Sequence, residues 1–401
     1  MRFCLITLLI LSTMSGVNAG VQLELDENTY VDLGVRLQAL YLSTENDLNA
    51  DNRFEADEDF ILRRGRIILD GTISERMEAK LETEIGAGAA DTSDETRIVD
   101  AYLTIKIFKS LNLDIGLQMT PSSRQGLTTS DSLMAFDRPG LAYKALTWGN
   151  KTKYQFTNQT YIDSGSKFES DYDERDTGVT LYGFKSFNDS FHFKYYMGTY
   201  NGVQLSDGDE LRYTGRLQWN FGDLEDSYHV KSTYLGNKQT IGIGVSYDKQ
   251  DAVAYSLDKG DICYTYYSGD IFAEMPMGNG SLTVETGVIN LDLDTSMFTF
   301  SSSSREESEL WSTLGAQGKG LYLQTGYYIN NWQPWFEFET WESKDILDRG
   351  NYNIARIGLT YFIKEQIANI KAGYEQFTTD APIMGVEDTV ESMVIGVFLD
   401  Y

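Results

Sequence analysis

The chain contains little cysteine, proline, histidine or basic charge, and it has no long apolar run. Its 401 residues include 2 Cys, 5 Pro and 2 His, and 33 basic residues stand against 60 acidic ones, for a formal net charge of −27. A strongly negative protein repels phosphate backbones, which excludes nucleic-acid binding through bulk charge. No segment has 18 consecutive apolar residues, so the sequence predicts no transmembrane helix. The 26 Tyr, 20 Phe and 6 Trp do not fit a disordered chain.

The N-terminus has the composition of a secretory signal peptide. Arg2 supplies positive charge, residues 5–14 form a short apolar stretch, and small side chains precede a predicted cut between Ala19 and Gly20. We therefore expect residues 1–19 to be removed. The mature chain, residues 20–401, is expected to form a single domain; it retains one cysteine and therefore has no internal disulfide.

Apolar and polar residues alternate along most of the mature chain. From Val31 to Tyr41, for example, the odd positions are apolar, while Asp32, Arg36 and Gln38 fall at even ones. A β-strand sends these two sets to opposite faces. The runs reach about 9–13 residues, long enough to cross a membrane as tilted strands, and short connections alternate with long ones. The pattern predicts an all-β fold, a transmembrane antiparallel β-barrel.

Sixteen strands are expected in this barrel, and one long connection leaves eighteen open. The exception is 222–239, which falls on the side of the short turns and has room for another strand pair. The longest connection, the third loop, covers 120–175. The strands are predicted at 29–42, 60–70, 76–86, 97–108, 111–119, 176–186, 190–200, 211–221, 240–248, 261–275, 281–291, 319–329, 334–342, 353–363, 367–378 and 392–401.

The last strand carries a sharp signal for the bacterial outer membrane. Apolar residues alternate from Met393 to a terminal aromatic residue, Tyr401. Outer-membrane barrels commonly end in this way, and we expect Tyr401 to act as the membrane-insertion signal read by the assembly machinery. Outer-membrane lipid and lipopolysaccharide are the expected surroundings, with the acidic outer loops binding divalent cations that bridge to lipopolysaccharide.

Several motifs, in order, resemble the phosphate-selective porin O and P family over nearly the whole mature chain. The resemblance implies a sixteen-stranded, homotrimeric porin whose third loop narrows the lumen. The segment 140–174 is longer than the family pattern, and the chain is strongly acidic, so the resemblance alone does not fix a preference for phosphate. The motifs are FILRRGR at 60–66 with Asp70-Gly71, VDAYL at 99–103, GLQMTP at 116–121, RDTGV at 175–179 and RIGLTYF at 356–362.

Basic residues of the lumen face and of the third loop are the candidate pore-lining, selectivity-determining residues. The first part of that loop, 120–153, has five basic residues against two acidic ones, which would make the constriction locally positive. Guanidinium groups suit phosphate oxygens. Alternatively, the arginines pair with Glu78, Glu82, Glu84 or Asp100 on the same face and hold the wall rigid. The candidates are Arg36, Arg64, Arg66, Lys80, Lys106, Arg124, Arg138, Arg356 and Lys371.

Three functions are compatible with these features. The first is a passive diffusion porin for small ions with a modest preference for anions, phosphate included. The second is a weakly selective or cation-preferring porin governed by the acidic loops. The third is a structural or adhesive barrel with a plugged lumen. No nucleophile elbow, phosphate loop or metal-ligand cluster appears, so we expect no enzyme activity, no catalytic residues, no cofactor and no metal site.

Overall fold

The computed structural model describes ten stretches of the chain. They are residues 21–26, 28–46, 55–85, 96–143, 175–202, 210–256, 260–292, 318–343, 351–379 and 389–401. The predicted signal peptide and the part of the third loop between 144 and 174 lie outside these residues. Among the described residues, no helix has both the length and the apolar character needed to cross a membrane.

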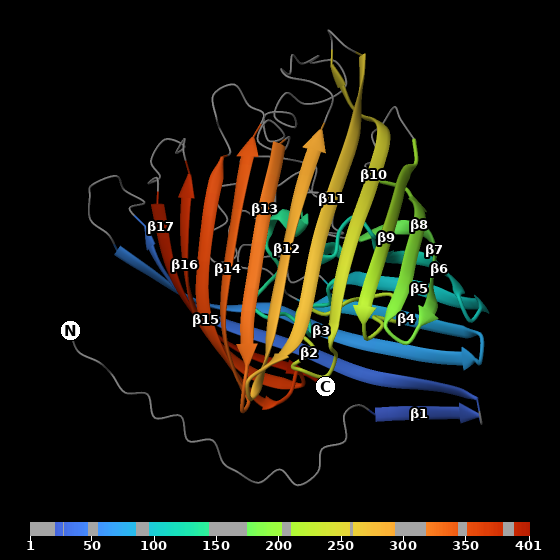
Figure 1. Cartoon of the computed structure of the whole chain (residues 1–401), viewed down its shortest axis with the longest axis horizontal. Helices are drawn as coiled ribbons and strands as arrows, with labels where there is room; N and C mark the ends of the chain where they lie inside the picture. Colours follow the sequence, from blue (N-terminus) through green and yellow to red (C-terminus); the bar gives the residue numbers. More distant parts are fainter. Residues whose placement is uncertain are drawn as a thin grey trace.

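Sixteen antiparallel strands form a closed barrel (Figure 1). Each strand from β2 to β17 pairs with the next one in sequence, and β17 pairs with β2 to complete the circle. The predicted fold class and strand number are confirmed. The strands are β2 (Thr29–Asn46), β3 (Glu55–Ser74), β4 (Met77–Ile85), β5 (Thr96–Phe108), β6 (Leu111–Met119), β7 (Arg175–Asn188), β8 (Phe191–Tyr200), β9 (Arg212–Gly222), β10 (Thr240–Ser256), β11 (Gly260–Met277), β12 (Gly280–Asp292), β13 (Gly318–Tyr328), β14 (Trp332–Ser343), β15 (Tyr352–Lys364), β16 (Ala368–Thr379) and β17 (Thr389–Asp400).

The barrel is apolar outside and polar inside. On β17, Met393, Ile395 and Val397 point outward and are at least half exposed. On β9, the inward residues Arg212 and Arg216 are fully buried. This arrangement reverses that of a soluble barrel, and it is the one that a hydrocarbon exterior requires.

A short additional strand, β1 (Val21–Asp26), extends the wall beside β2. Val21 is opposite Leu33, whereas Val35 exchanges two backbone hydrogen bonds with Tyr401, at 2.6 and 2.8 Å. Because the other edge of β2 pairs with β3, β1 and β17 share one edge of β2 and follow one another along it. The role of Tyr401 in membrane insertion stays a prediction.

Two segments fold into the lumen. One is residues 120–143, the described part of the third loop, which contains the short 3-10 helices η1 (Gln125–Leu127) and η2 (Gly140–Tyr143). The other is residues 223–239, here named the turn segment. The eighteen-strand alternative was wrong, since the turn segment forms no strand pair: its one bridge is parallel and joins Val230 to Thr128 of the third loop. Some of its backbone N–H groups donate to a wall side chain instead, as Tyr234 and Gly236 do to Glu274.

A charge on the outer face should be costly in the middle of a strand and tolerated near its end. We expect Ile395→Arg to destabilise the barrel by about 2–4 kcal/mol, since Ile395 is outward-facing and midway along β17. Glu391→Arg, on the same face but near the first residue of β17, is the control and should cost about 0–1 kcal/mol. Urea unfolding of the protein refolded in lipid vesicles measures both, and equal losses would contradict the membrane-facing assignment.

Candidate functional site

The described part of the third loop leaves β6 and contacts several strands of the lumen wall. Near its start, Ser122 donates to Asp248 of β10 at 2.7 Å and accepts from Arg212 of β9 at 2.9 Å. Near the end of its described part, the backbone N–H groups of Gly140 and Leu141 donate to the Glu339 carboxylate of β14 at 3.0 and 3.1 Å. The loop is therefore held by inward side chains of strands that are far apart in sequence.

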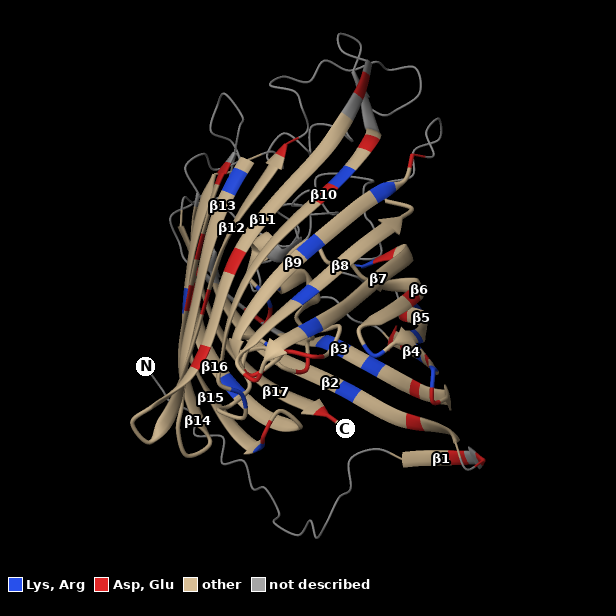
Figure 2. Cartoon of the chain, turned by 45° about the vertical axis from the view of Figure 1, so that its right-hand side comes forward, with Lys and Arg blue, Asp and Glu red and all other residues tan. Residues whose placement is uncertain are grey.

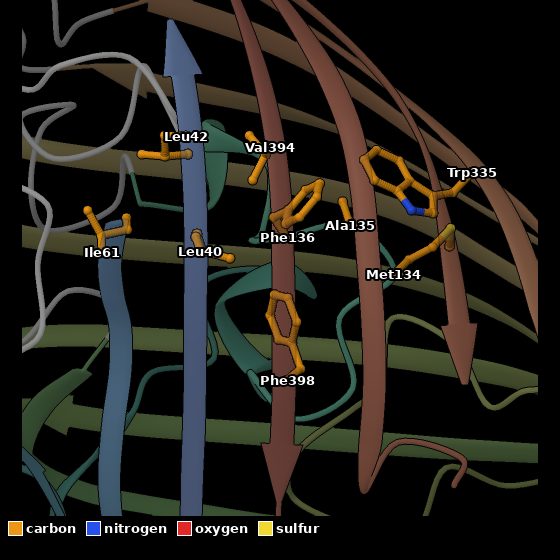
Figure 3. Packing of buried hydrophobic residues seen from close by; sticks show 9 residues of the cluster. All are labelled: Leu40, Leu42, Ile61, Met134, Ala135, Phe136, Trp335, Val394 and Phe398. Atoms are coloured by element: carbon orange, nitrogen blue, oxygen red, sulfur yellow. The ribbon is translucent and has the colours of Figure 1, made fainter. Parts of the chain in front are cut away.

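An apolar anchor fixes the middle of the third loop. Met134, Ala135 and Phe136 pack against apolar side chains that point inward from β2, β3, β14 and β17 (Figure 3). The Phe136 ring meets Trp335 edge to face, with centroids 5.8 Å apart. Lys371 of β16 adds two hydrogen bonds from its Nζ to the loop, to the carbonyl oxygens of Leu133 and Ala135 at 2.5 and 2.6 Å. The wall residues are Leu40, Leu42, Ile61, Trp335, Val394 and Phe398.

Seven of the nine predicted pore-lining residues are buried: Arg36, Arg64, Arg66, Arg124, Arg138, Arg356 and Lys371. The barrel wall carries its basic and acidic residues on neighbouring strands (Figure 2). Five of these bases are paired with carboxylates, and Arg138 and Lys371 donate to backbone carbonyl oxygens.

Arg36 and Arg66 share a carboxylate. Arg36 donates to Asp400 at 3.0 Å and to Glu82 at 3.3 Å, and Arg66 donates to Glu82 at 2.7 Å and to Glu84 at 3.1 Å. Glu82 thus lies between two guanidinium groups, and both arginines are neutralised by carboxylates on β4 and β17.

Two arginines hold the third loop near residue 137: Arg64 from β3, and Arg138 from within the loop itself. Arg64 donates to Asp137 at 2.8 Å and to the Gln38 amide at 2.7 Å. Arg138 donates through Nε to the carbonyl oxygen of Thr128 at 2.8 Å. These two groups fasten the loop to the wall and to itself.

Arg356 lies within a cluster of glutamates on neighbouring strands. Its guanidinium contacts Glu337, Glu339 at 2.9 Å, and Glu375, all of them buried. A single base thus lies among three acids in this part of the lumen wall.

Lys80 and Lys106 remain in contact with water. Their side chains are 20% and 43% exposed, and each has an acidic neighbour: Asp70 at 3.4 Å from Lys80, and Glu78 beside Lys106. Asp70 and Glu78 are themselves 54% and 43% exposed. The accessible charges of this wall are therefore of both signs.

Four further arginines of the lumen were not among the predicted pore-lining residues. Arg97 pairs with Glu84, Arg175 with Asp100, Arg212 with Asp248, and Arg216 with Asp270. For β9 the signal was present, since Arg212, Thr214, Arg216, Gln218 and Asn220 alternate with apolar or small residues and so share the inward face. The partners could not be read in this way, because they lie on other strands.

Arg124 joins the third loop to the turn segment. It donates two hydrogen bonds to Glu225, at 2.7 and 3.0 Å, and one to the carbonyl oxygen of Lys231 at 3.1 Å. Its guanidinium carbon is 3.8 Å from the centroid of the Phe272 ring. Burial alone would raise the pKa of Glu225, but the Arg124 guanidinium outweighs it and holds that pKa below its ordinary value.

A cavity of about 650 Å³ opens between the turn segment, Thr129 and Asp131 of the third loop, and the β15–β16 turn. Two lysines, Lys231 and Lys238, line it. Burial and the nearby Lys80 and Arg175 lower the pKa of His229 to about 3, so this residue is neutral at pH 7. Five acidic residues also line the cavity: Asp131, Glu225, Asp226, Glu365 and Asp400.

Within the part of the chain that the structure describes, no group of three or more His, Cys, Asp and Glu side chains is placed to hold a metal ion. The described geometry consists of paired charges around a lumen that two segments narrow. Such a lumen can sort ions by size and charge.

Comparison with known proteins supplies a family. The chain matches the family described as phosphate-selective porin O and P over residues 33–250. An uncharacterized protein of Aquifex aeolicus (strain VF5) is 22% identical over 310 residues, which cover 72% of this chain but only 64% of that relative.

Solved structures show the same fold at low sequence identity. The anion-selective porin from Comamonas acidovorans has a TM-score of 0.58 at 11% identity, covering 93% of this chain and all of that one. OmpF of Salmonella typhi, in complex with daunomycin, has a TM-score of 0.54 at 14% identity, covering 95% and 100%. Both similarities concern the fold alone.

Removing the apolar anchor should release the middle of the third loop. We expect Phe136→Ala to weaken loop docking by about 3–5 kcal/mol, since the ring is fully buried against Trp335 and Phe398. Hydrogen–deuterium exchange of residues 131–137 should rise strongly in this variant and less in Phe136→Leu. Unchanged exchange in Phe136→Ala would show that the polar contacts alone hold the loop.

His229 should make stability depend on pH. An unfolded histidine titrates near pH 6.5, whereas folded His229 has its pKa lowered to about 3, so the unfolded state binds the extra proton between these values. The free energy of unfolding therefore carries no penalty from His229 above about pH 6.5, and it decreases progressively as the pH falls toward 3. The stability curve of His229→Gln, measured by urea unfolding from pH 7 to pH 5, should be flatter than that of the wild type; parallel curves would contradict the burial effect.

Proposed function

The chain belongs to the phosphate-selective porin O and P family, and we propose that it is a weakly selective diffusion channel that favours small cations. The family and the barrel fold are those of bacterial outer-membrane porins, which are channels and not enzymes. Solute passes through such a channel passively, so selectivity depends on the charges that water and ions can reach.

The charge balance of the cavity is the observation that carries the proposed preference. Five acidic and two basic residues line it, and His229 is neutral. Burial alone would raise the pKa of Asp131, but Arg36 outweighs it and keeps this carboxylate charged at neutral pH. Arg124 and Arg36, which do not themselves line the cavity, pair with Glu225 and Asp400, and this makes the expected preference weak.

The barrel wall supports the same conclusion. Arg36, Arg66 and Arg356 each contact at least two carboxylates and are at most 8% exposed, so they offer little unbalanced positive charge to a passing anion. The exposed Lys80 and Lys106 face Asp70 and Glu78, so this stretch of wall adds no net positive field.

A preference for anions, phosphate included, is the second candidate. It is favoured by the clustering of Arg36, Arg64 and Arg66 beside the third loop, because guanidinium groups bind phosphate oxygens in pairs. The homotrimer remains a prediction from the family resemblance, and the contacts with lipopolysaccharide remain a prediction from the acidic outer loops; neither enters the charge argument.

The reversal potential under a KCl gradient distinguishes the candidates. We expect the purified protein in a planar bilayer to show a potassium-favouring potential, because carboxylates outnumber lysines in the cavity. Added phosphate should leave the current unchanged. A chloride-favouring potential with block by phosphate would establish the second candidate instead, and absence of conductance would establish a plugged, structural or adhesive barrel.

Variants of exposed residues locate the preference. Glu365→Gln with Asp226→Asn should move the reversal potential toward chloride, because both carboxylates line the cavity. Lys106→Gln and Lys80→Gln remove accessible positive charge and should move it toward potassium. A reversal potential unchanged by the acidic substitutions would contradict a role for the cavity.

A further inference from the structure

The turn segment meets the third loop deep in the lumen, although it enters from the end of the barrel that carries the short turns. Val230 and the third loop exchange two backbone hydrogen bonds: the Val230 N–H donates to the Leu127 carbonyl at 3.1 Å, and the Thr129 N–H donates to the Val230 carbonyl at 3.2 Å. The Tyr228 hydroxyl donates to the carbonyl oxygen of Met119 at 2.6 Å. These contacts involve Met119 at the end of β6 and residues 127–129 of the third loop, and residues 120–132 are named here the first half of that loop.

The ion pair between Arg124 and Glu225 is the most deeply buried of these contacts. The two side chains are 0% and 1% exposed. Glu285 is a second carboxylate near Arg124, at 3.6 Å. Removing one member of a buried, hydrogen-bonded pair leaves the other charge uncompensated, which makes the docked arrangement unfavourable.

The turn segment has its own attachment to the wall. The buried Glu274 of β11 accepts hydrogen bonds from the N–H groups of Tyr234 and Gly236 at 2.8 and 2.6 Å, and from the Thr283 hydroxyl at 2.9 Å. The turn segment is thus fixed to β11 and β12 independently of the third loop. It presents Glu225 to Arg124 from that position.

We infer that the turn segment is a second constriction element of the pore and that Glu225 is the residue that positions the first half of the third loop. Residues 134–136 and 140–141 are held by the barrel wall, at the apolar anchor and at Glu339. In the earlier part of the loop, Ser122 and Gln125 also contact the wall, but Arg124 between them donates two hydrogen bonds to Glu225 of the turn segment. The bore is then set jointly by segments that enter from opposite ends of the barrel. This inference rests on the proposed channel function but not on its ion preference.

Single-channel recording of Glu225→Ala tests the inference. We expect a larger conductance and added current noise with intermediate levels, because the first half of the third loop loses its ionic partner. Asp223→Asn is the matched control: it removes an exposed carboxylate of the turn segment that does not line the cavity, and the amide oxygen can still accept the hydrogen bond from the Gln239 N–H. The control should change neither conductance nor noise, and a folded Glu225→Ala protein that behaves like it would overturn the inference.

A charge swap separates positioning from general damage to the fold. Arg124→Glu combined with Glu225→Arg restores the pair in reverse and should return conductance and noise toward wild-type values, while each single substitution should not. Heat-modifiable migration on gels verifies that each variant is folded. A double variant that is as noisy as the single ones would count against the proposed role of the pair.

A cross-link tests docking even where Glu225→Ala does not fold. In a Cys263→Ser background, Thr128→Cys with Val230→Cys places thiols on residues that face each other across the bridge. The oxidised protein should form the bond completely and conduct as before, whereas loss of current on oxidation would show that the segments separate in the open channel. Hydrogen–deuterium exchange of residues 120–132, low in the wild type and raised in Glu225→Ala, decides the positioning role without any current and so separates its failure from that of the channel function.

Discussion

The pairing of β17 with β2 is the interaction on which the rest of the molecule depends. In hydrocarbon, an unpaired backbone N–H or C=O has no water to turn to, so a spanning sheet is stable only when it has no free edge. The register from Glu391 opposite Glu45 to Asp400 opposite Arg36 removes that edge. Closure also creates the enclosed space in which the buried charges of the lumen find one another.

Charge pairing inside that space explains how a chain of net charge −27 can bury many of its acidic residues in the lumen. Glu82 lies between Arg36 and Arg66, and Glu225 lies against Arg124, so that desolvation of each carboxylate is offset by a guanidinium within hydrogen-bond distance. Buried pairs of this kind stabilise one arrangement chiefly because breaking them is costly. In the lumen these pairs fix the loops to the wall. Because the two charges of each pair neutralise one another, they contribute little to the electric field that an ion meets.

The alternation of side chains was sufficient to predict the barrel, because a transmembrane strand must obey period 2 along its whole length. Leu111–Met119 was located to the residue, and Arg36, Lys80 and Arg356 were placed on the polar face by parity alone. Alternation shows which face of the sheet a side chain lies on, but not how deeply it is buried in the lumen. The sequence therefore could not distinguish the partly exposed Lys106 from the buried Arg356.

The fold of the turn segment could not be predicted for a different reason. Residues 223–239 show no regular period, and their length alone was compatible with a strand pair. What determines their course is a set of partners far away in sequence: Glu225 meets Arg124, 101 residues earlier, and Tyr234 meets Glu274, 40 residues later. Such contacts exist only once the barrel has closed around them.

The order of β1 and β17 along one edge of β2 has a consequence for the topology of the barrel. β1 and the end of β17 follow one another along a single edge of β2, with Val21 opposite Leu33 and Tyr401 hydrogen-bonded to Val35. The two ends of the described chain therefore meet in line, as successive parts of one strand position. The wall is in effect a ring whose order has no preferred beginning: a circular permutant that joined these ends and opened at Asn330-Asn331 would keep every strand pair of the barrel.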